Sequence, residues 1–190
     1  MQAYCPRAGT VTVFSPVTLL SLSRDRAIFP TVSVLNSEMK RLVERQRLGF
    51  VATVCPDGTP NLSPKGTTAV WDDDHLVFAD IRSPGSVSNL RRNPAVEINV
   101  VDPLLRKGYR FKGIARVLGD GALFEEILAF FRKRGVSSPI EHIVVIRVER
   151  ALPLVSPAYD SGATEEEVRG RWQDYWRSIE RGDSTPRTGE

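Results

Sequence analysis

The sequence predicts a mainly β fold, a closed or nearly closed β-barrel with peripheral helices. About six short segments are rich in β-branched and aromatic residues or alternate apolar with polar residues, which is the period of a strand. Short turns join most of these segments, so we expect mostly antiparallel pairing. The few segments with helical periodicity interrupt the strands without alternating regularly with them.

The composition indicates one soluble globular domain. The chain has 190 residues, of which 41% are hydrophobic and 26% charged, and this balance excludes a mostly disordered protein. The net charge of +3 is spread without a polybasic block, which suits a phosphorylated small ligand better than nucleic acid. No apolar run reaches the roughly 18 residues of a membrane span, and we expect a cytoplasmic protein.

Three regions differ in character. Residues 1–34 do not match the rest and are interpreted as a poorly ordered N-terminal extension, not a signal peptide. Residues 35–181 form the barrel domain with a C-terminal helix, and residues 182–190 form a disordered tail. The cysteines, Cys5 and Cys55, indicate no disulfide framework. The histidines, His75 and His142, are predicted to be ordinary hydrogen-bonded strand residues, and no metal site is expected.

The first helix is predicted over residues 36–47, with Asn36 or Ser37 at its cap and an apolar stripe on one side. Residues 48–55 are apolar on both alternating sets, so this strand should be covered on both sides. Pro56-Asp-Gly-Thr59 forms a turn, and the following strand should deliver Ser63, Lys65 and Thr67 to one face. Residues 72–74 turn the chain so that a strand over 75–80 returns alongside.

Ser83-Pro-Gly-Ser86 is predicted to open a short helix that ends at Asn93-Pro94. A helix N-terminus beside two serine hydroxyls and Lys65 is a place where a phosphate can bind. The alternative is that Ser83 simply caps the helix and Lys65 is solvated.

The next two strands cover residues 95–101, with Val96, Ile98 and Val100 inward, and residues 109–118. On the second of these strands Arg110 and Lys112 share a face, which either is solvated or meets a ligand or partner subunit. Gly113 would admit another backbone or a flat ring.

A helix over residues 120–134 is expected to bury Leu123, Ile127, Leu128 and Phe131. A central strand should cover residues 142–150, with Pro153 and Pro157 breaking regularity after it. Thr164-Glu-Glu-Glu167 is a capping box that starts the last helix. The aromatic stripe of that helix is either docking surface or, in part, a contact to a bound ring.

Several of these segments together resemble the flavin-nucleotide-binding proteins related to pyridoxamine 5'-phosphate oxidase. The segments are Gly49-Phe-Val-Ala-Thr-Val54, Asp57-Gly-Thr-Pro60, Ser63-Pro-Lys-Gly66, Leu76-Val-Phe-Ala-Asp80, Ser83-Pro84, Asn89-Leu90 and Asn93-Pro-Ala-Val96. The resemblance implies an FMN-binding split β-barrel of Greek-key type, with FMN between the two subunits of a homodimer.

Carried over by position, the resemblance implies a set of FMN-binding residues. They are Ser63, Lys65, Gly66, Thr67, Ala79, Asp80, Ser83, Ser86 and Asn89, with Arg110 and Lys112 as candidate cations beside the flavin ring. No catalytic residue is identified. The oxidase itself has more basic phosphate contacts where this chain has Ser63 and Pro84-Gly85, and its pyridoxal-phosphate-binding residues have no match here. The resemblance therefore implies an FMN-dependent oxidoreductase of unknown substrate, with NAD(P)H as a possible reductant.

Two alternatives stay open on the same fold. One is a non-catalytic flavin or haem carrier or sensor, although haem would need His75 or His142 as its axial ligand. The other is a reductase that uses a deazaflavin in place of FMN. A nucleic-acid partner is not expected.

Overall fold

The computed structural model describes residues 33–182. Seven strands in this range are β1 (Gly49–Val54), β2 (Pro60–Lys65), β3 (Ala69–Val70), β4 (His75–Asp80), β5 (Ala95–Asp102), β6 (Lys107–Leu118) and β7 (His142–Val155). The helices are α1 (Ser37–Gln46), α2 (Pro84–Arg92), α3 (Ala122–Lys133), the 3-10 helix η1 (Pro157–Tyr159) and α4 (Glu165–Glu180). The predictions for residues 1–32 and 183–190 lie outside the described residues. Among those described, no helix combines the length and the apolar run that crossing a membrane requires.

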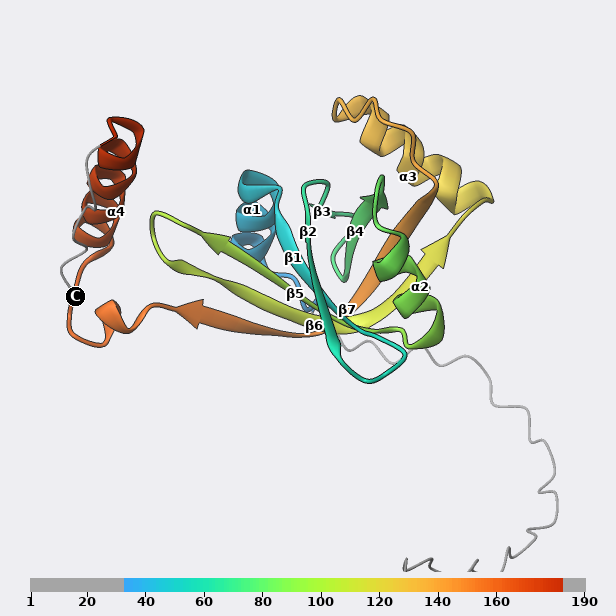
Figure 1. Cartoon of the computed structure of the whole chain (residues 1–190), viewed down its shortest axis with the longest axis horizontal. Coiled ribbons are helices and arrows are strands. Elements are labelled where there is room, and N and C mark those ends of the chain that lie inside the picture. The colour runs from blue at the N-terminus through green and yellow to red at the C-terminus, as the bar shows by residue number, and fades with distance from the viewer. Residues whose placement is uncertain (1–32, 183–190) are drawn as a thin grey trace, which may run out of the picture. The chain divides into compact units, whose positions relative to one another are not determined.

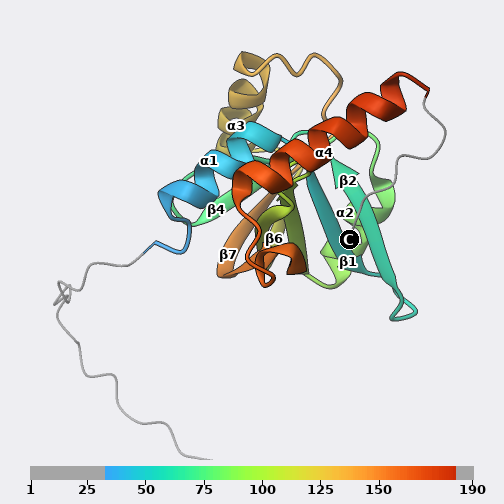
Figure 2. The same cartoon turned by 90° about the vertical axis from the view of Figure 1, so that its left-hand side faces the viewer.

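The seven strands form one antiparallel sheet in the order β2-β1-β5-β6-β7-β4-β3. The sheet curls into a half-barrel, as Figure 1 and the view turned by 90° in Figure 2 show. Strands that are distant in sequence are neighbours, such as β1 with β5 and β4 with β7, which is the non-sequential pairing of a Greek-key arrangement. The predicted mainly β split-barrel fold is confirmed.

Two hydrophobic clusters cover β4 on both of its faces. Inside the curl, Phe78 of β4 packs with Phe111 of β6 and with α1 and α2. On the other face, Ala79 of β4 packs with Ile127 and other side chains of α3. All five residues from Leu76 to Asp80 are therefore buried, and β4 gives the polar residues at its end a rigid support.

Several local predictions are confirmed. The Asn36 side chain caps α1 by accepting from the amide of Met39 at 2.9 Å, and β5 alternates with Val96, Ile98 and Val100 buried. Thr164 and Glu167 form the predicted capping box at the start of α4. In α3, Phe124, Ile127 and Phe131 are buried, whereas Leu123 and Leu128 are only partly so.

Three predictions need correction. First, within a single chain β1 is covered on one side only, since Phe50 and Val54 on its outer face are exposed, and cover on the second side would have to come from a partner subunit. Second, β7 does not end near residue 150 but continues through Pro153 to Val155. This is tolerated because β4 pairs with β7 only as far as Arg147, so one edge of β7 is free where Pro153 lacks an N–H. Third, β2 ends at Lys65, and Thr67 lies in the turn that follows.

Candidate functional site

The Lys65 side chain is a buried ammonium without a carboxylate partner. Lys65 is the last residue of β2, and only 4% of it is exposed. Its Nζ donates to Ser63 Oγ at 2.6 Å and to Ser83 Oγ at 2.7 Å. Among residues 33–182 no carboxylate lies within ion-pair distance of it. A buried charge with only hydroxyl partners is poorly compensated, so the surroundings of the Lys65 ammonium favour the binding of an anion.

The N-terminal end of α2 points to the same place. Ser83 occupies the N-cap position of α2, but its hydroxyl makes no capping bond and instead accepts from Lys65. The Ser83 amide is held by Asp80 Oδ1 at 2.8 Å. Because the amides of the first helical turn have no acceptor within a helix, those of Gly85 and Ser86 have none there; Gly85 is exposed, whereas Ser86 is buried. The space beside Gly85 is open. Backbone amides and the Lys65 ammonium thus converge as an anion site.

The charges of Lys65 and Asp80 act on each other without direct contact. Burial lowers the pKa of the Lys65 ammonium, and the negative charge of Asp80 partly opposes this shift. Asp80 is itself buried. A phosphate at Ser83 would add negative charge beside Lys65 and would favour its protonated form further.

Ser86 and Asn89 have structural contacts that fasten α2 to β1 and β2. The Asn89 amide donates to Thr53 Oγ1 at 3.0 Å and lies 3.6 Å from Cys55 Sγ. The amide of Asn61, on β2, donates to the same Thr53 oxygen at 3.0 Å and reaches Ser86 Oγ at 3.5 Å. Sequence reasoning missed Thr53 and Asn61, although Asn61 alternates with Ser63 and Lys65 on one face of β2.

The loop after β2 lies against the end of β4. Thr67 Oγ1 accepts from the Ala79 amide at 2.9 Å and donates to the Ala79 carbonyl at 3.3 Å. Gly66 has open space where a side chain would project. The structure therefore brings nine of the predicted residues into one region, namely Ser63, Lys65, Gly66, Thr67, Ala79, Asp80, Ser83, Ser86 and Asn89.

Arg110 and Lys112 lie on the opposite face of the sheet from Lys65. They are on the outer face of β6, where both bind Glu97 of β5, each at 2.9 Å. Their neighbour Asn99 has a buried side-chain oxygen without a partner among the described residues. Within one chain these two cations do not reach the anion site.

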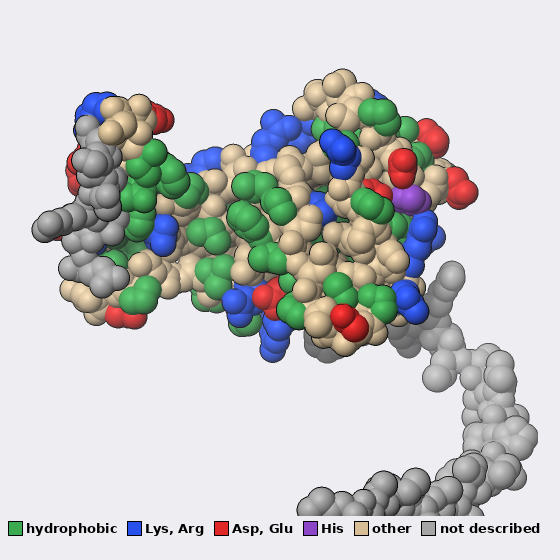
Figure 3. Space-filling model, in the orientation of Figure 1, with side chains coloured by type: hydrophobic (Ala, Val, Ile, Leu, Met, Phe, Trp, Pro, Cys, Tyr) green, Lys and Arg blue, Asp and Glu red, His purple; other side chains and the backbone are tan. Residues whose placement is uncertain are grey.

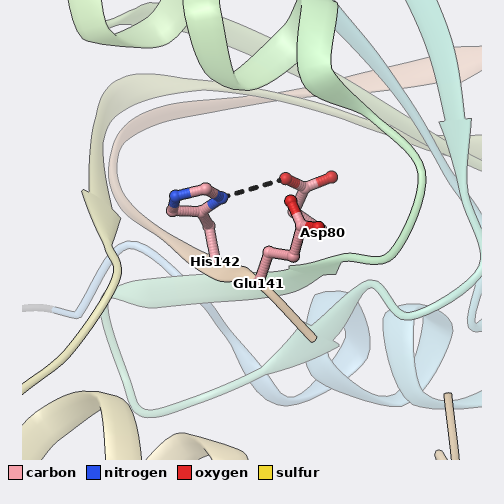
Figure 4. A group of neighbouring side chains, drawn as sticks. All are labelled: Asp80, Glu141 and His142. Atoms are coloured by element: carbon pink, nitrogen blue, oxygen red, sulfur yellow. Dashed lines mark hydrogen bonds and ion pairs between the residues drawn. The ribbon is translucent and has the colours of Figure 1, made fainter. Parts of the chain in front are cut away.

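The two histidines pair with aspartates, as ordinary strand residues do. His75 Nδ1 lies 2.8 Å from Asp72 Oδ1, and His142 Nδ1 lies 3.2 Å from Asp80 Oδ2. Figure 4 shows the second pair together with Glu141. Asp80, Glu141 and His142 each offer one ligand atom within 4.8 Å of the others, a grouping that sequence reasoning missed. Both Asp80 oxygens already accept hydrogen bonds, so we interpret the pair as a support for Asp80 behind the anion site.

Comparisons with known proteins agree with this geometry. Residues 35–153 match the family described as Pyridoxamine 5'-phosphate oxidase, which is more than half of the chain. The chain belongs to this family. No curated protein matches it.

Several solved structures have the same fold as this chain. The chain is 34% identical to HupZ of Group A Streptococcus, over 64% of this chain and 95% of that one, with a TM-score of 0.58. A putative pyridoxamine 5'-phosphate oxidase from Lactobacillus delbrueckii is 24% identical over 65% and 97%, with a TM-score of 0.56. An FMN-binding protein from Syntrophomonas wolfei is 16% identical over 62% and 84%, with a TM-score of 0.53. The latter two likenesses concern the fold alone. The family match ends within β7, before α4.

Proposed function

We propose that this protein is an FMN-binding oxidoreductase that holds the FMN phosphate at Lys65 and the start of α2. The proposal includes a homodimer with the flavin between its subunits. The observation that carries it is the Lys65 ammonium, 4% exposed, whose hydrogen-bond partners among residues 33–182 are two serine hydroxyls at 2.6 and 2.7 Å. An FMN-binding protein among the solved structures of this fold supports the choice of cofactor.

The residues present fit the phosphate end of FMN. Lys65 offers a positive charge, Ser63 and Ser83 offer hydroxyls, and the amides of Gly85 and Ser86 offer uncharged donors. Asp80 holds the Ser83 amide and thus fixes the start of the helix. When bound, FMN supplies the hydride and electron chemistry, and the chain binds and orients it.

The position of Arg110 and Lys112 supports a flavin shared by two subunits. Both cations lie on the outer face of the sheet, whereas Lys65 of the same chain lies on the inner face. In a homodimer that buries the outer face, the partner subunit's Lys112 would approach the pyrimidine edge of the ring, which becomes anionic on reduction.

The test compares FMN with riboflavin, which lacks the phosphate. Flavin fluorescence quenching is titrated for the natural chain and for Lys65→Met. A hydrogen bond to a charged group is worth about 1.5–3 kcal/mol, so FMN binding should weaken about 10- to 150-fold. Riboflavin binding should stay unchanged, because it makes no phosphate contact.

Lys133→Met is the matched control, because Lys133 is an exposed cation near the end of α3. It should leave both affinities as they are. An equal loss of FMN and riboflavin binding in Lys65→Met would place the phosphate elsewhere. A natural chain that quenches neither flavin would refute the proposal.

Enzyme and carrier are separated by turnover. The flavin-loaded protein is mixed with NADH or NADPH without oxygen, and the flavin absorbance is followed before and after an acceptor is added. Repeated cycles of bleaching and recovery support an oxidoreductase. Flavin that binds but never cycles identifies a carrier or sensor.

A further inference from the structure

The last helix, α4, carries an apolar stripe that the described residues leave partly uncovered. The stripe consists of Trp172, Tyr175, Trp176 and Ile179, which recur at helical spacing. Trp176 is 45% exposed and Ile179 43% exposed, and Val168 is the only buried residue of the helix. An aromatic stripe of this kind normally packs against another surface.

The first half of α4 is anchored to the β5–β6 region of the described chain. Glu165 pairs with Lys107 at 2.8 Å, and the Arg106 guanidinium lies over the Trp172 ring at 4.1 Å. Between this anchored end and α1 the chain leaves a cavity of about 760 Å³, lined by Leu42, Tyr109 and Val155 among others. The exposed Trp176 and Ile179 lie on the other half of α4, where they are accessible to an incoming surface.

A second exposed apolar surface lies on the outer face of β1 and β2. The register pairs Phe50 with Pro64, Ala52 with Leu62 and Val54 with Pro60, so all six side chains share this face. Phe50 is 42% exposed and Leu62 66% exposed. We call this surface the β1–β2 face. Figure 3 shows hydrophobic side chains over β1 and β2 and on the side of α4 that is turned toward the sheet.

We propose that α4 of one copy packs its apolar stripe on the β1–β2 face of a second copy. Every chain carries both surfaces, so a twofold axis brings each stripe onto the other copy's face and buries both sets twice. Both surfaces are visible in the single view of Figure 3, as a shared interface requires.

The edge of the sheet favours packing on its face over strand pairing. β2 is an edge strand, and its Pro60 and Pro64 have no N–H to donate to a further strand. Twofold symmetry buries the exposed parts of the α4 stripe and the β1–β2 face twice each, which adds their areas toward the order of 1,000 Å² that a specific interface needs.

The inference rests on the homodimer in the proposed function, but not on the cofactor. Because α4 lies beyond residues 35–153, which match the family, it describes a contact that this chain adds to the family domain. It can therefore be tested in protein that is free of flavin.

The test places the photo-crosslinker benzoylphenylalanine at position 176, where it replaces one large aromatic side chain with another. Chains with this residue are mixed with an excess of isotopically labelled natural chains, illuminated and analysed by peptide mass spectrometry. We expect crosslinks from position 176 to labelled peptides that contain residues 49–65. The control places the same crosslinker at Asp174, on the opposite side of α4, and should give at least tenfold fewer of these crosslinks.

Three results would overturn the inference. They are crosslinks to residues 1–32, crosslinks confined to one chain, and equal crosslinking from positions 174 and 176. Sedimentation gives a second readout, in which Trp176→Ala/Ile179→Ala should weaken the dimer at least tenfold, while Asp174→Ala leaves it unchanged. A dimer that is unaffected by the double variant also rejects the inference. Crosslinks to residues 49–65 in a protein that fails to bind FMN would refute the proposed function alone.

Discussion

Replacing Thr53 by valine tests how α2 is held at the anion site. Valine keeps the shape of threonine but removes the oxygen that accepts from both Asn61 and Asn89, each at 3.0 Å. Asn89 is 5% exposed and cannot turn to water, so the N–H of its amide that loses Thr53 and keeps no acceptor should cost about 1–3 kcal/mol, while the contact with Cys55 Sγ remains. Asn61 is partly exposed and adds less. We expect Thr53→Val to lower the free energy of unfolding by about 1–3 kcal/mol in urea titrations.

A double-mutant cycle shows whether this reasoning is correct. In the Thr53→Val background the Asn89 amide has already lost its acceptor, so Asn89→Leu should cost less than it does in the natural chain. Thr53→Ser, which keeps the oxygen, should behave closer to the natural chain in its hydrogen bonding. Equal costs of Asn89→Leu in both backgrounds, or a Thr53→Val variant as stable as the natural chain, would refute the account of how α2 is fastened.

Four further predictions concern the sheet, the anion site and the flavin. Gly113→Ala should destabilise the fold by at least about 1–3 kcal/mol in urea titrations, because a Cβ there would overlap the Arg147 carbonyl oxygen, whereas Gly170→Ala in α4 has open space and should be neutral or stabilising. FMN affinity should fall as the pH rises through the lowered pKa of Lys65, before the ordinary lysine range near 10.5, and titrations of Lys65→Met should show no such fall. The pKa of Lys65 is lower in the folded than in the unfolded protein, so at neutral pH the charged ammonium destabilises the folded state. Flavin-free Lys65→Met should therefore melt at a higher temperature than the natural chain at neutral pH. Lys112→Gln should lower the reduction potential of bound FMN in a spectroelectrochemical titration, and an unchanged potential would remove Lys112 from the flavin ring.

Most of the helices and strands could be predicted from the sequence, because strand alternation and helix capping depend on residues that are close in the sequence. The alternation along β5 and the capping residues Asn36 and Thr164 set their own elements. Gly113 was expected to admit a backbone or a flat ring, and the structure shows the backbone of β7 beside it. The extent of β7 could not be predicted, because whether Pro153 ends a strand depends on which edge is paired.

The site was only partly predictable, because the sequence does not show which polar side chains are buried or which residues from distant elements contact one another. The sequence brings Lys65 near Ser83, but it does not show that the ammonium lacks a carboxylate or that the Ser83 hydroxyl binds Lys65 instead of capping α2. The buried contact of Asn89 with Thr53 joins residues that are 36 positions apart, and no local pattern reveals it. Phe50 and Val54 were predicted to be covered but are exposed in the single chain. Apolar composition alone cannot distinguish a residue of the protein interior from one on an apolar surface that binds another subunit.

The burial of β4 on both faces bears on how the protein fluctuates. Amide protons of residues 76–79 should exchange with solvent only through opening of the whole domain, because two hydrophobic clusters must separate first. The Gly85 amide, in the first turn of α2, is exposed and has no acceptor within the helix, so it should exchange faster in the free protein. Ligand binding should therefore slow amide exchange at the start of α2 and leave exchange in residues 76–79 unchanged. Asp80 lies between these two segments, at the end of the strand that stays folded and before the helix start that responds to the ligand.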